Sequence, residues 1–512
     1  MMRGSEHPVP ACLRIAATAL LIVATGTGAL DSSSRAADPP RHGVKVKRLL
    51  IRSVMVVYGN AKPPFGPMDV LVEDGVIAEV QPSRRDRSGA DAVIDGTGKY
   101  LLPGFINTHM HWHEERAPGL VQPIQYERNL YLAAGVTTAR ELGGDFEKSK
   151  RWRAESAAGS IAAPRMVVFV RPSMGRRRSA EEIRAGVREA KAKGADGLKL
   201  MSLDRDQLEA VLGEAQHLGL PTTAHIGVEE TTARDYIELG VTSIEHFYGI
   251  ADAALAGIQR FPADMNYSDE VQRFARAGEL YAQADPARLD AVLDLMVEKG
   301  VAWSPTLSIY EAARDLVRHQ NLPWYREHLH PALLAFWQPG ADRHGSFFVG
   351  WTNTQEARWK QNYRIWMDAL RRFGVKGGVI TTGDDAGYIW SLYGFGLIRE
   401  LELQEEAGFH PLEVIKHATV NGARLLGLGD RLGRVRVGFD ADLLLVNGNP
   451  IENLHVLNPA GADVDVNGRN VRGGGIEWTI KDGIPYHGPT LMNEVREMVA
   501  QAKTDATQTT GQ

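Results

Sequence analysis

The sequence predicts an α/β fold, a (β/α)8 barrel joined to a small β domain that is built from both ends of the chain. Short apolar runs alternate with helical stretches through the middle of the chain, and there are eight such runs. Hairpin-like segments lie near both ends. At 512 residues, with 44% hydrophobic content, the chain can form a large barrel with additions around a sizeable core.

The β domain is predicted from segments that alternate apolar and polar residues. Residues 48–59 and 68–82 show this pattern, and Asp74-Gly75 divides the second run as a hairpin turn does. The pattern returns at 441–448 and around Asp482-Gly483. Neither end has enough strands for a stable sheet, so we expect residues 38–103 and 436–490 to pair into one composite domain.

The barrel is expected to occupy residues 104–435. Helix signals separate its strands: Ser179 and Glu182 form a capping box, and Gly219 and Gly300 end two amphipathic stretches. The eight candidate strands are 104–109, 136–141, 165–170, 197–201, 221–225, 242–246, 301–306 and 378–383. Two long connections, 246–301 and 306–378, should form extra helices over the barrel mouth, whereas the polar tail 491–512 is expected to be frayed.

The first 37 residues are typical of an export signal. Arg3 and Arg14 precede an apolar run that is too short to span a bilayer comfortably, and small residues follow it. We predict a signal peptide at residues 1–37 and a periplasmic or secreted product with no membrane segment after cleavage; a retained anchor is the alternative. Because the only cysteine, Cys12, lies before the run, a metal in the mature chain must bind through His, Asp, Glu or Lys.

Charge and aromatic content bear on the expected partners. The net charge of -5 and the absence of a long basic block argue against nucleic acid as a partner. A small molecule is the expected partner instead, and assembly into a homo-oligomer is left open.

Half of the ten tryptophans lie close together, where they should cover the barrel mouth and line an apolar pocket, or else pack the lid's own helices. These are Trp324, Trp337, Trp351, Trp359 and Trp366.

Ionisable residues end six of the eight predicted strands. His109 and His111, at positions i and i+2, leave the same face of the first strand and can converge on a metal ion. The other strand-end residues are Arg140 or Glu141, Lys199, His225, His246, and Asp384 or Asp385. Barrel enzymes place their catalytic groups at the carboxyl ends of the strands, so this set predicts an active site there.

Several segments make the sequence resemble the metal-dependent amidohydrolase superfamily. They are PGFINTHMH, GLKL, TTAH, SIEH, TGDDAG and HATVNGARLLGLGDRLGRVRVGFDADLLLVNGNP, and they follow one another in order between about residues 48 and 488. The resemblance is to the binuclear subtype with a carbamylated lysine, which includes imidazolonepropionase-like and Xaa-Pro dipeptidase-like amidohydrolases. It implies a distorted (β/α)8 TIM barrel and a small β-sandwich domain.

The resemblance also implies a set of metal ligands. By motif position, His109 and His111 would hold the more buried metal, and His225 and His246 the second. Lys199 matches the lysine that carbon dioxide carbamylates, and its new carboxylate would bridge the two ions. Two divalent ions are therefore implied, with zinc as first choice and manganese, cobalt or iron left open.

The strand-eight motif departs from the family pattern Gly-Thr-Asp-Ala-Gly. Here Asp385 falls on the metal position, and Asp384 stands where threonine is usual. The second carboxylate could either tune the base or lie in solvent. In the expected mechanism a metal-bridging hydroxide attacks a polarised carbonyl, and Asp385 passes the proton to the leaving nitrogen.

The predicted activity is hydrolysis of a carbon–nitrogen amide-type bond in a dipeptide, an N-acyl amino acid or a related amide. The alternatives are a mononuclear deaminase of the same superfamily and a non-catalytic binding relative. The deaminase scheme needs a glutamate three residues after the strand-five histidine, but Glu229 comes four residues after His225, and the scheme has no use for Lys199. A binding relative would be expected to have lost metal ligands, and the motifs keep all of them.

Overall fold

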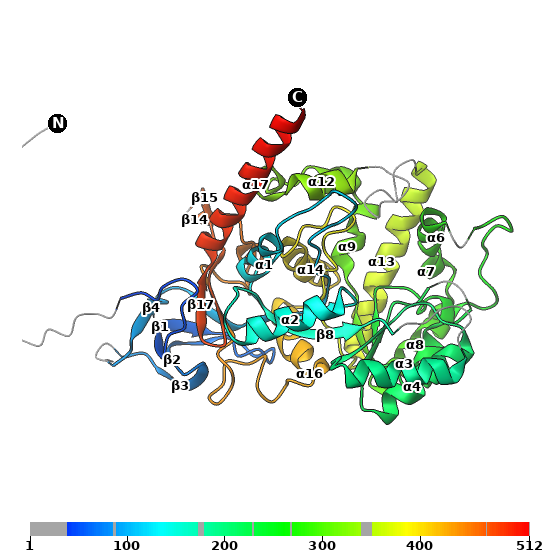
Figure 1. Ribbon diagram of the computed structural model, residues 1–512, viewed down its shortest axis with the longest axis horizontal. Helices are drawn as coiled ribbons and strands as arrows, with labels where there is room; N and C mark the ends of the chain where they lie inside the picture. Colours follow the sequence, from blue (N-terminus) through cyan, green and yellow to red (C-terminus); the bar gives the residue numbers. More distant parts are fainter. Residues whose placement is uncertain are drawn as a thin grey trace, which may run out of the picture. The chain divides into compact units, whose positions relative to one another are not determined.

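The computed structural model describes residues 38–84, 89–172, 179–227, 230–266, 269–338, 351–466 and 468–510 (Figure 1). The predicted signal peptide, residues 1–37, lies outside these ranges. So does Glu229, on which the comparison with deaminases depends. Within the described ranges, no helix is both long enough and apolar enough to cross a membrane.

Seven parallel strands form the barrel sheet, and each pairs with the next one along the chain. They are β6 (Phe105–Met110), β7 (Val136–Leu142), β8 (Arg165–Val170), β9 (Gly197–Leu200), β10 (Thr222–Ala224), β11 (Ser243–Glu245) and β12 (Ala302–Ser304). This order confirms the barrel prediction for the first seven candidate strands. The strands are buried because helices cover them, which explains why they read as short apolar runs.

The eighth candidate, residues 378–383, differs from the prediction because it is an extended connection and not a regular strand. It still links the two edges of the sheet through three backbone hydrogen bonds: Trp303 N to Val379 O (2.9 Å), Thr381 N to Trp303 O (3.0 Å) and Thr108 N to Thr382 O (2.8 Å). Asp385, just beyond it, has a left-handed backbone (φ 45°), so the chain turns away before a longer ladder can form. The barrel is therefore nearly closed.

Helices lie between the strands and in the two long connections (Figure 1). Ser179 and Glu182 form the predicted capping box of α3, and Gly300 ends α8 with φ 69°. The helices are α1 (Ile124–Ala133), α2 (Phe146–Ala157), α3 (Ala180–Ala192), α4 (Arg205–His217), α5 (Ala233–Glu238), α6 (Glu270–Ala277), α7 (Leu280–Gln283), α8 (Pro286–Lys299), α9 (Leu307–Tyr310), α10 (Leu316–Gln320), α11 (Tyr325–His328), α12 (Pro331–Trp337), α13 (Asn353–Val375), α14 (Phe395–Glu406), α15 (Pro411–Lys416) and α16 (Gly422–Leu425).

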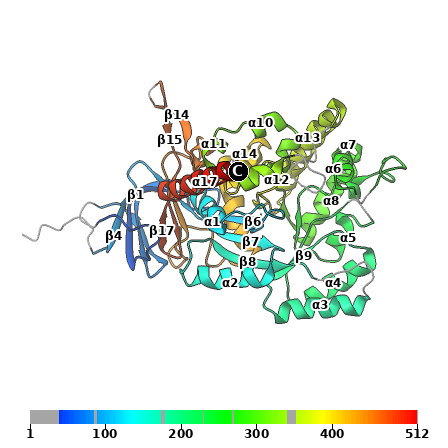
Figure 2. The ribbon, with the colours of Figure 1, turned by 45° about the horizontal axis from the view of Figure 1, so that its top comes forward.

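The β domain joins both ends of the chain in one sheet of order β17-β16-β13-β5-β1-β2-β3, with β4 beside β1. Its strands are β1 (Arg48–Val56), β2 (Phe65–Glu73), β3 (Val76–Pro82), β4 (Ala92–Asp95), β5 (Tyr100–Pro103), β13 (Leu443–Val446), β16 (Ile476–Lys481) and β17 (Ile484–His487). The antiparallel pairing of β13 with β5 joins the two ends. Strands β14 (Ala462–Val466) and β15 (Arg469–Gly473) form a separate two-stranded ribbon (Figure 2).

The C-terminal tail is helical, so the expectation of a frayed tail was wrong. Helix α17 (Gly488–Thr510) follows β17 directly and runs beside α1 (Figure 1). Its apolar face is buried, and Asn129 Nδ2 of α1 donates to Glu494 Oε2 at 2.7 Å. The buried residues are Leu491, Met492, Val495 and Val499. Their helical spacing on one face explains why this polar segment is ordered.

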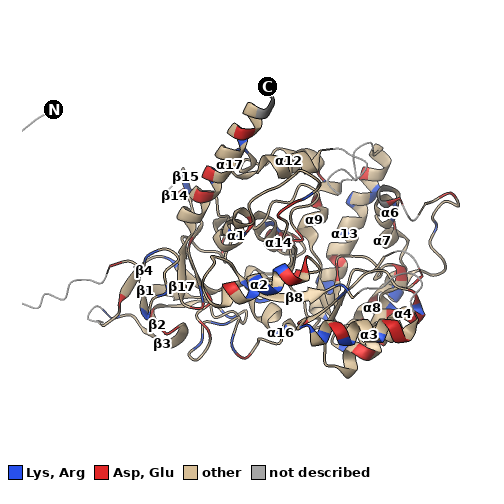
Figure 3. Cartoon of the chain, viewed as in Figure 1, with Lys and Arg blue, Asp and Glu red and all other residues tan. Residues whose placement is uncertain are grey.

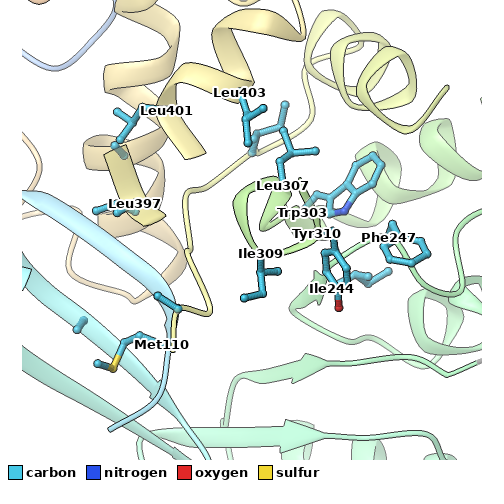
Figure 4. Close-up of a cluster of buried hydrophobic side chains, with 14 of the residues drawn as sticks. Met110, Ile244, Phe247, Trp303, Leu307, Ile309, Tyr310, Leu397, Leu401 and Leu403 are labelled. Carbon is cyan, nitrogen blue, oxygen red and sulfur yellow. The ribbon is translucent and has the colours of Figure 1, made fainter. Parts of the chain in front are cut away.

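A buried apolar cluster supports the barrel mouth. Figure 4 shows Ile244 of β11 near Phe247, Trp303 of β12, and Leu307 and Tyr310 of α9. All five side chains are at most 4% exposed. Close packing of this kind holds the short helix α9 in one position. The side chains on the face of α9 that points away from the cluster are therefore held in place as well.

Charged residues of both signs intermingle on α2, α3 and α4 (Figure 3). A different, largely buried ion cluster joins the barrel to the β domain. Arg165, at the start of β8, bonds Asp442 at 2.5 Å and also contacts Asp440 and Asp482. Asp442 is 4% exposed, so its charge depends on this arginine.

We predict that Arg165→Ala lowers the free energy of unfolding by about 3–5 kcal/mol, because it leaves a buried carboxylate without its partner. Urea unfolding followed by circular dichroism measures the change. The matched control is Arg151→Ala, which removes an exposed ion pair with Glu155 and should cost less than about 1 kcal/mol. Equal effects of the two substitutions would contradict the prediction.

Candidate metal centre

All six sequence-predicted site residues line one cavity of about 210 Å³ at the carboxyl ends of the barrel strands. They are His109, His111, Lys199, His225, His246 and Asp385. Five of them lie at or just beyond the end of a barrel strand, with His109 and His111 sharing β6, and Asp385 follows the extended connection 378–383. The geometry therefore brings together side chains that are up to 276 residues apart in the sequence, from 109 to 385.

The tightest group in the cavity is His109, His246 and Asp385. One possible ligand atom from each residue lies within 4.8 Å of the others, as donor atoms around a metal ion do. His111 adds to this group, because its Nε2 lies 3.3 Å from Asp385 Oδ1. His109 Nε2 lies 3.6 Å from the same oxygen.

His225 and Lys199 extend the group on the other side. The ring centroids of His225 and His246 are 4.5 Å apart, and His225 also stacks on Tyr248 at 5.1 Å. Lys199 is 2% exposed, and burial lowers its pKa to about 8, which makes the neutral amine accessible near neutral pH. A neutral lysine amine is nucleophilic, whereas the ammonium is not.

Two hydrogen bonds fix the histidine rings. His109 Nδ1 donates to Glu245 Oε2 at 2.7 Å, and His246 Nδ1 lies 2.7 Å from Thr306 Oγ1. The Nε2 atoms therefore point to the cavity, as expected for metal-binding histidines with an oriented ring. Burial, together with the nearby Lys199, holds the pKa of His109 well below its usual range, so the ring is neutral and can act as a ligand.

The backbone is strained where the ligands leave the strands. His246 and Asp385 have φ angles of 64° and 45°, in the left-handed region that non-glycine residues rarely adopt. Asp385 N donates to His109 O at 2.9 Å, which holds the turn against β6. Strain of this kind persists where the surrounding structure holds it, and it is common at functional sites.

Asp384 is placed differently from Asp385. It is fully buried and accepts a hydrogen bond of 2.7 Å from Asn107 Nδ2, so the alternative that it lies in solvent was wrong. Burial raises its pKa to about 7. It does not line the cavity, and Asp385 is the carboxylate that does.

The donor set fits divalent metal ions. Within the described part of the chain, Lys199 Nζ, His246 Nε2 and Asp385 Oδ1 are buried and have no hydrogen-bond partner. Buried polar atoms without partners are rare, and three of them around one cavity indicate that a further group completes the site. Imidazole nitrogens and carboxylate oxygens are ligands that zinc and similar ions prefer.

Sequence reasoning missed the residues that orient these ligands. Glu245 and Thr306 position the histidine rings, and Asn107 holds Asp384. A charged residue inside the apolar strand of the SIEH motif was an available signal for Glu245. No local pattern distinguishes Thr306 or Asn107, because their roles depend on partners from distant strands.

The walls of the cavity are aromatic and aliphatic. Tyr248, Phe274, Tyr310 and Tyr388 line it, together with Met201, Ile309 and Ile389. Of the five clustered tryptophans, none is among its described lining residues. Trp359 instead stacks behind the wall, 4.6 Å from Phe274 and 6.3 Å from Tyr310 between ring centroids. Trp359 therefore supports the pocket from behind.

Comparison with known proteins agrees with this geometry. A model of the Amidohydrolase family matches residues 100–471, which is more than half of the chain. The chain belongs to the amidohydrolase family. This amidohydrolase also shares its fold with solved structures: a Xaa-Pro dipeptidase with bound methionine (TM-score 0.61, 20% identity, covering 86% of this chain and 100% of that one) and a bottromycin amidohydrolase (TM-score 0.64, 20% identity, 90% and 92%).

Curated relatives match only a short segment of the amidohydrolase. A 5-methylthioadenosine/S-adenosylhomocysteine deaminase of Pyrococcus furiosus is 37% identical over 76 residues, which are 15% of this chain and 17% of the relative. The chain thus spans less than a fifth of that relative's length in the match.

We predict that Asp385→Asn lowers kcat for amide hydrolysis by about 10²–10⁴-fold, because Asp385, and not the neighbouring Asp384, lines the cavity and can carry a proton there. Asp384→Asn is the matched control and should keep kcat within about tenfold, since its side chain contacts Asn107 in the wall. Steady-state kinetics of the metal-loaded variants measures both. Loss of activity in Asp384→Asn alone would show that the two roles are reversed.

Proposed function

We propose that this protein is a metal-dependent hydrolase that cleaves a carbon–nitrogen amide-type bond. The observation that carries the proposal is the convergence of four histidines, Lys199 and Asp385 on one cavity, with buried donor atoms that lack partners. The family model and the shared fold support it.

Two divalent ions, with zinc as first choice, would be held by these residues. We assign His109 and His111 to one ion and His225 and His246 to the other, with Asp385 as a further ligand. When bound, such ions polarise a carbonyl and make water nucleophilic at neutral pH. Lys199 would serve as a shared ligand after carbamylation, in which its neutral amine adds to carbon dioxide and releases one proton.

Asp385 is the proposed proton carrier. Burial alone would raise its pKa, but His109 and His111 outweigh this effect and lower it, so the carboxylate is ionised at neutral pH. An ionised carboxylate can take a proton from the attacking water and give it to the leaving nitrogen. The left-handed turn at Asp385 aims this carboxylate at the cavity.

The lining suggests the substrate class. The aromatic and aliphatic walls suit an apolar side chain, whereas Arg171, directly after β8, is an exposed cation that lines the same cavity. Among the described lining residues it is the one charged group outside the proposed ligand set. An arginine here favours a substrate with a free carboxylate, such as a dipeptide or an N-acyl amino acid.

A mononuclear deaminase is the second candidate, favoured by the short match to the Pyrococcus relative. Lys199 argues against it, because a deaminase with one ion leaves a buried amine without a role in the cavity. The number of bound ions separates the two: about two equivalents support the hydrolase and one the deaminase. No bound metal would favour a non-catalytic relative.

Export to the periplasm or the medium is a further proposal, and it rests on the sequence of residues 1–37. Arg3, Arg14 and the apolar run after them are its support. An exported hydrolase of this kind would act on amides or peptides outside the cytoplasm.

We predict that Lys199→Ala reduces bound metal and activity together, because one substitution removes a ligand shared by both ions. A short carboxylic acid such as formate should restore part of the activity by supplying oxygens in the vacated space. Metal analysis by mass spectrometry and turnover assays measure the two effects.

The matched control is Lys481→Ala. Lys481 is also buried, but it lies in β16 of the β domain, donates to Ser156 O at 2.6 Å and does not line the cavity, so its loss should lower stability with metal retained. A Lys199→Ala variant that keeps its metal and near-normal turnover would exclude the carbamate.

We predict that Arg171→Gln raises KM for N-acetyl-phenylalanine by about tenfold or more, since it removes a charged hydrogen-bond donor for the carboxylate. KM for N-acetyl-phenethylamine, which lacks the carboxylate, should change little. Arg184→Gln, on the exposed face of α3, is the control variant. Equal changes for both substrates would show that Arg171 does not read the carboxylate.

A further inference from the structure

A second cavity, of about 410 Å³, shares a wall with the metal-centre cavity. Two short segments, 308–311 and 388–392, form this wall. Ile309, Tyr310, Tyr388 and Ile389 line the metal-centre cavity, and their sequence neighbours Ser308, Glu311, Trp390, Ser391 and Leu392 line the second. A displacement of the residues that line one cavity would therefore also displace their sequence neighbours, which line the other.

The aromatic residues that line the second cavity suit an apolar, planar ligand. Trp324 and Phe395 line it and stack on each other with centroids 5.1 Å apart and an angle of 9° between the rings. Tyr325 and Trp390 add two further aromatic rings, 6.4 Å apart. Cavities that combine aromatic rings with polar groups are typical of small-molecule sites.

Three buried polar atoms of this lining have no hydrogen-bond partner within the described part of the chain. They are Ser308 Oγ, Trp324 Nε1 and Ser391 Oγ. Ser391 is 4% exposed, so water does not compensate readily from outside. The indole N–H is a donor only, and it therefore calls for an acceptor oxygen on whatever fills the cavity.

The charged lining residues favour an anion. Glu311 and Glu402 are already bonded by Arg399, at 2.6 and 2.7 Å. Arg318 and Arg472 also line the cavity, with side chains 45% and 53% exposed, and each retains donors beyond its one ion pair. The lining therefore carries three arginines against two glutamates, and the exposed guanidinium groups of Arg318 and Arg472 are accessible to a carboxylate.

We propose that this cavity is a second binding site, for small aromatic carboxylates, and that its occupant acts on the metal centre through residues 388–392. Ile389 and Trp390 are consecutive non-glycine residues with φ angles of 43° and 59°. A strained turn of this kind keeps its conformation only through contacts with its surroundings. A ligand that contacts Trp390 and Ser391 would therefore change the position of Tyr388, which lines the metal-centre cavity. The binding part of the proposal does not depend on the proposed hydrolase activity.

The first test measures binding of 1-naphthoate to the full chain by isothermal titration calorimetry. Leu322→Trp places a larger side chain in the cavity lining and should weaken binding by about tenfold or more. Val317→Trp is the matched control, because Val317 is 71% exposed on the neighbouring helix α10 and does not line the cavity. The cation 1-naphthylmethylammonium should bind more weakly than 1-naphthoate.

The second test measures hydrolysis with and without saturating 1-naphthoate. A change in kcat or KM that is non-competitive with substrate, and that Leu322→Trp abolishes, supports the proposal. Binding that survives Leu322→Trp, or competes with substrate, places the ligand in the metal-centre cavity and overturns it. Binding without any kinetic change overturns the coupling, and a failure of hydrolysis altogether leaves the calorimetric test decisive for the site.

Discussion

The buried carboxylate of Glu245 is the interaction on which the barrel interior and the site both depend. It joins four strands, because Glu245 of β11 bonds His109 of β6, Arg140 of β7 and Thr223 of β10. A charge at 0% exposure is costly unless it is paired and fully hydrogen-bonded, and Arg140 provides that pairing at 2.6 Å. The same carboxylate that ties the strands together thus sets the direction in which His109 presents its ligand nitrogen.

Most of the architecture follows from patterns that a sequence carries locally. Alternating apolar runs and helix caps such as Ser179 with Glu182 were enough for the barrel and its helices. The irregular eighth position and helix α17 were not foreseen, for physical reasons. Residues 378–383 satisfy their backbone through two neighbouring strands without forming a regular ladder, and α17 gains its order by burying one face against α1.

The six side chains of the candidate metal centre were predictable because each stands at the end of a predicted strand, where a barrel collects its polar groups. Their supporting residues were not, since a hydrogen bond such as that of His246 to Thr306 depends on contacts between strands that no spacing reveals. The pair Asp384 and Asp385 shows the same limit of sequence-based prediction. The two neighbouring side chains lie in different environments, and only the hydrogen bond of Asp384 with Asn107 distinguishes their roles. The second cavity has no sequence signature at all, because its lining comes from several distant segments.

The composite sheet has a consequence for the order in which the molecule can be assembled. Strand β5 (Tyr100–Pro103) pairs with β13 (Leu443–Val446). During synthesis, β5 therefore lacks this partner strand until residue 446 has been made. During that time the barrel can fold while the N-terminal strands of the β domain expose an unpaired edge. An unpaired strand edge can associate with other chains. Strands β16 and β17 and helix α17, which follow β13 in the sequence, then complete the sheet and cover α1. A chain truncated before them would keep its barrel strands and lose the strands that complete the sheet of the β domain.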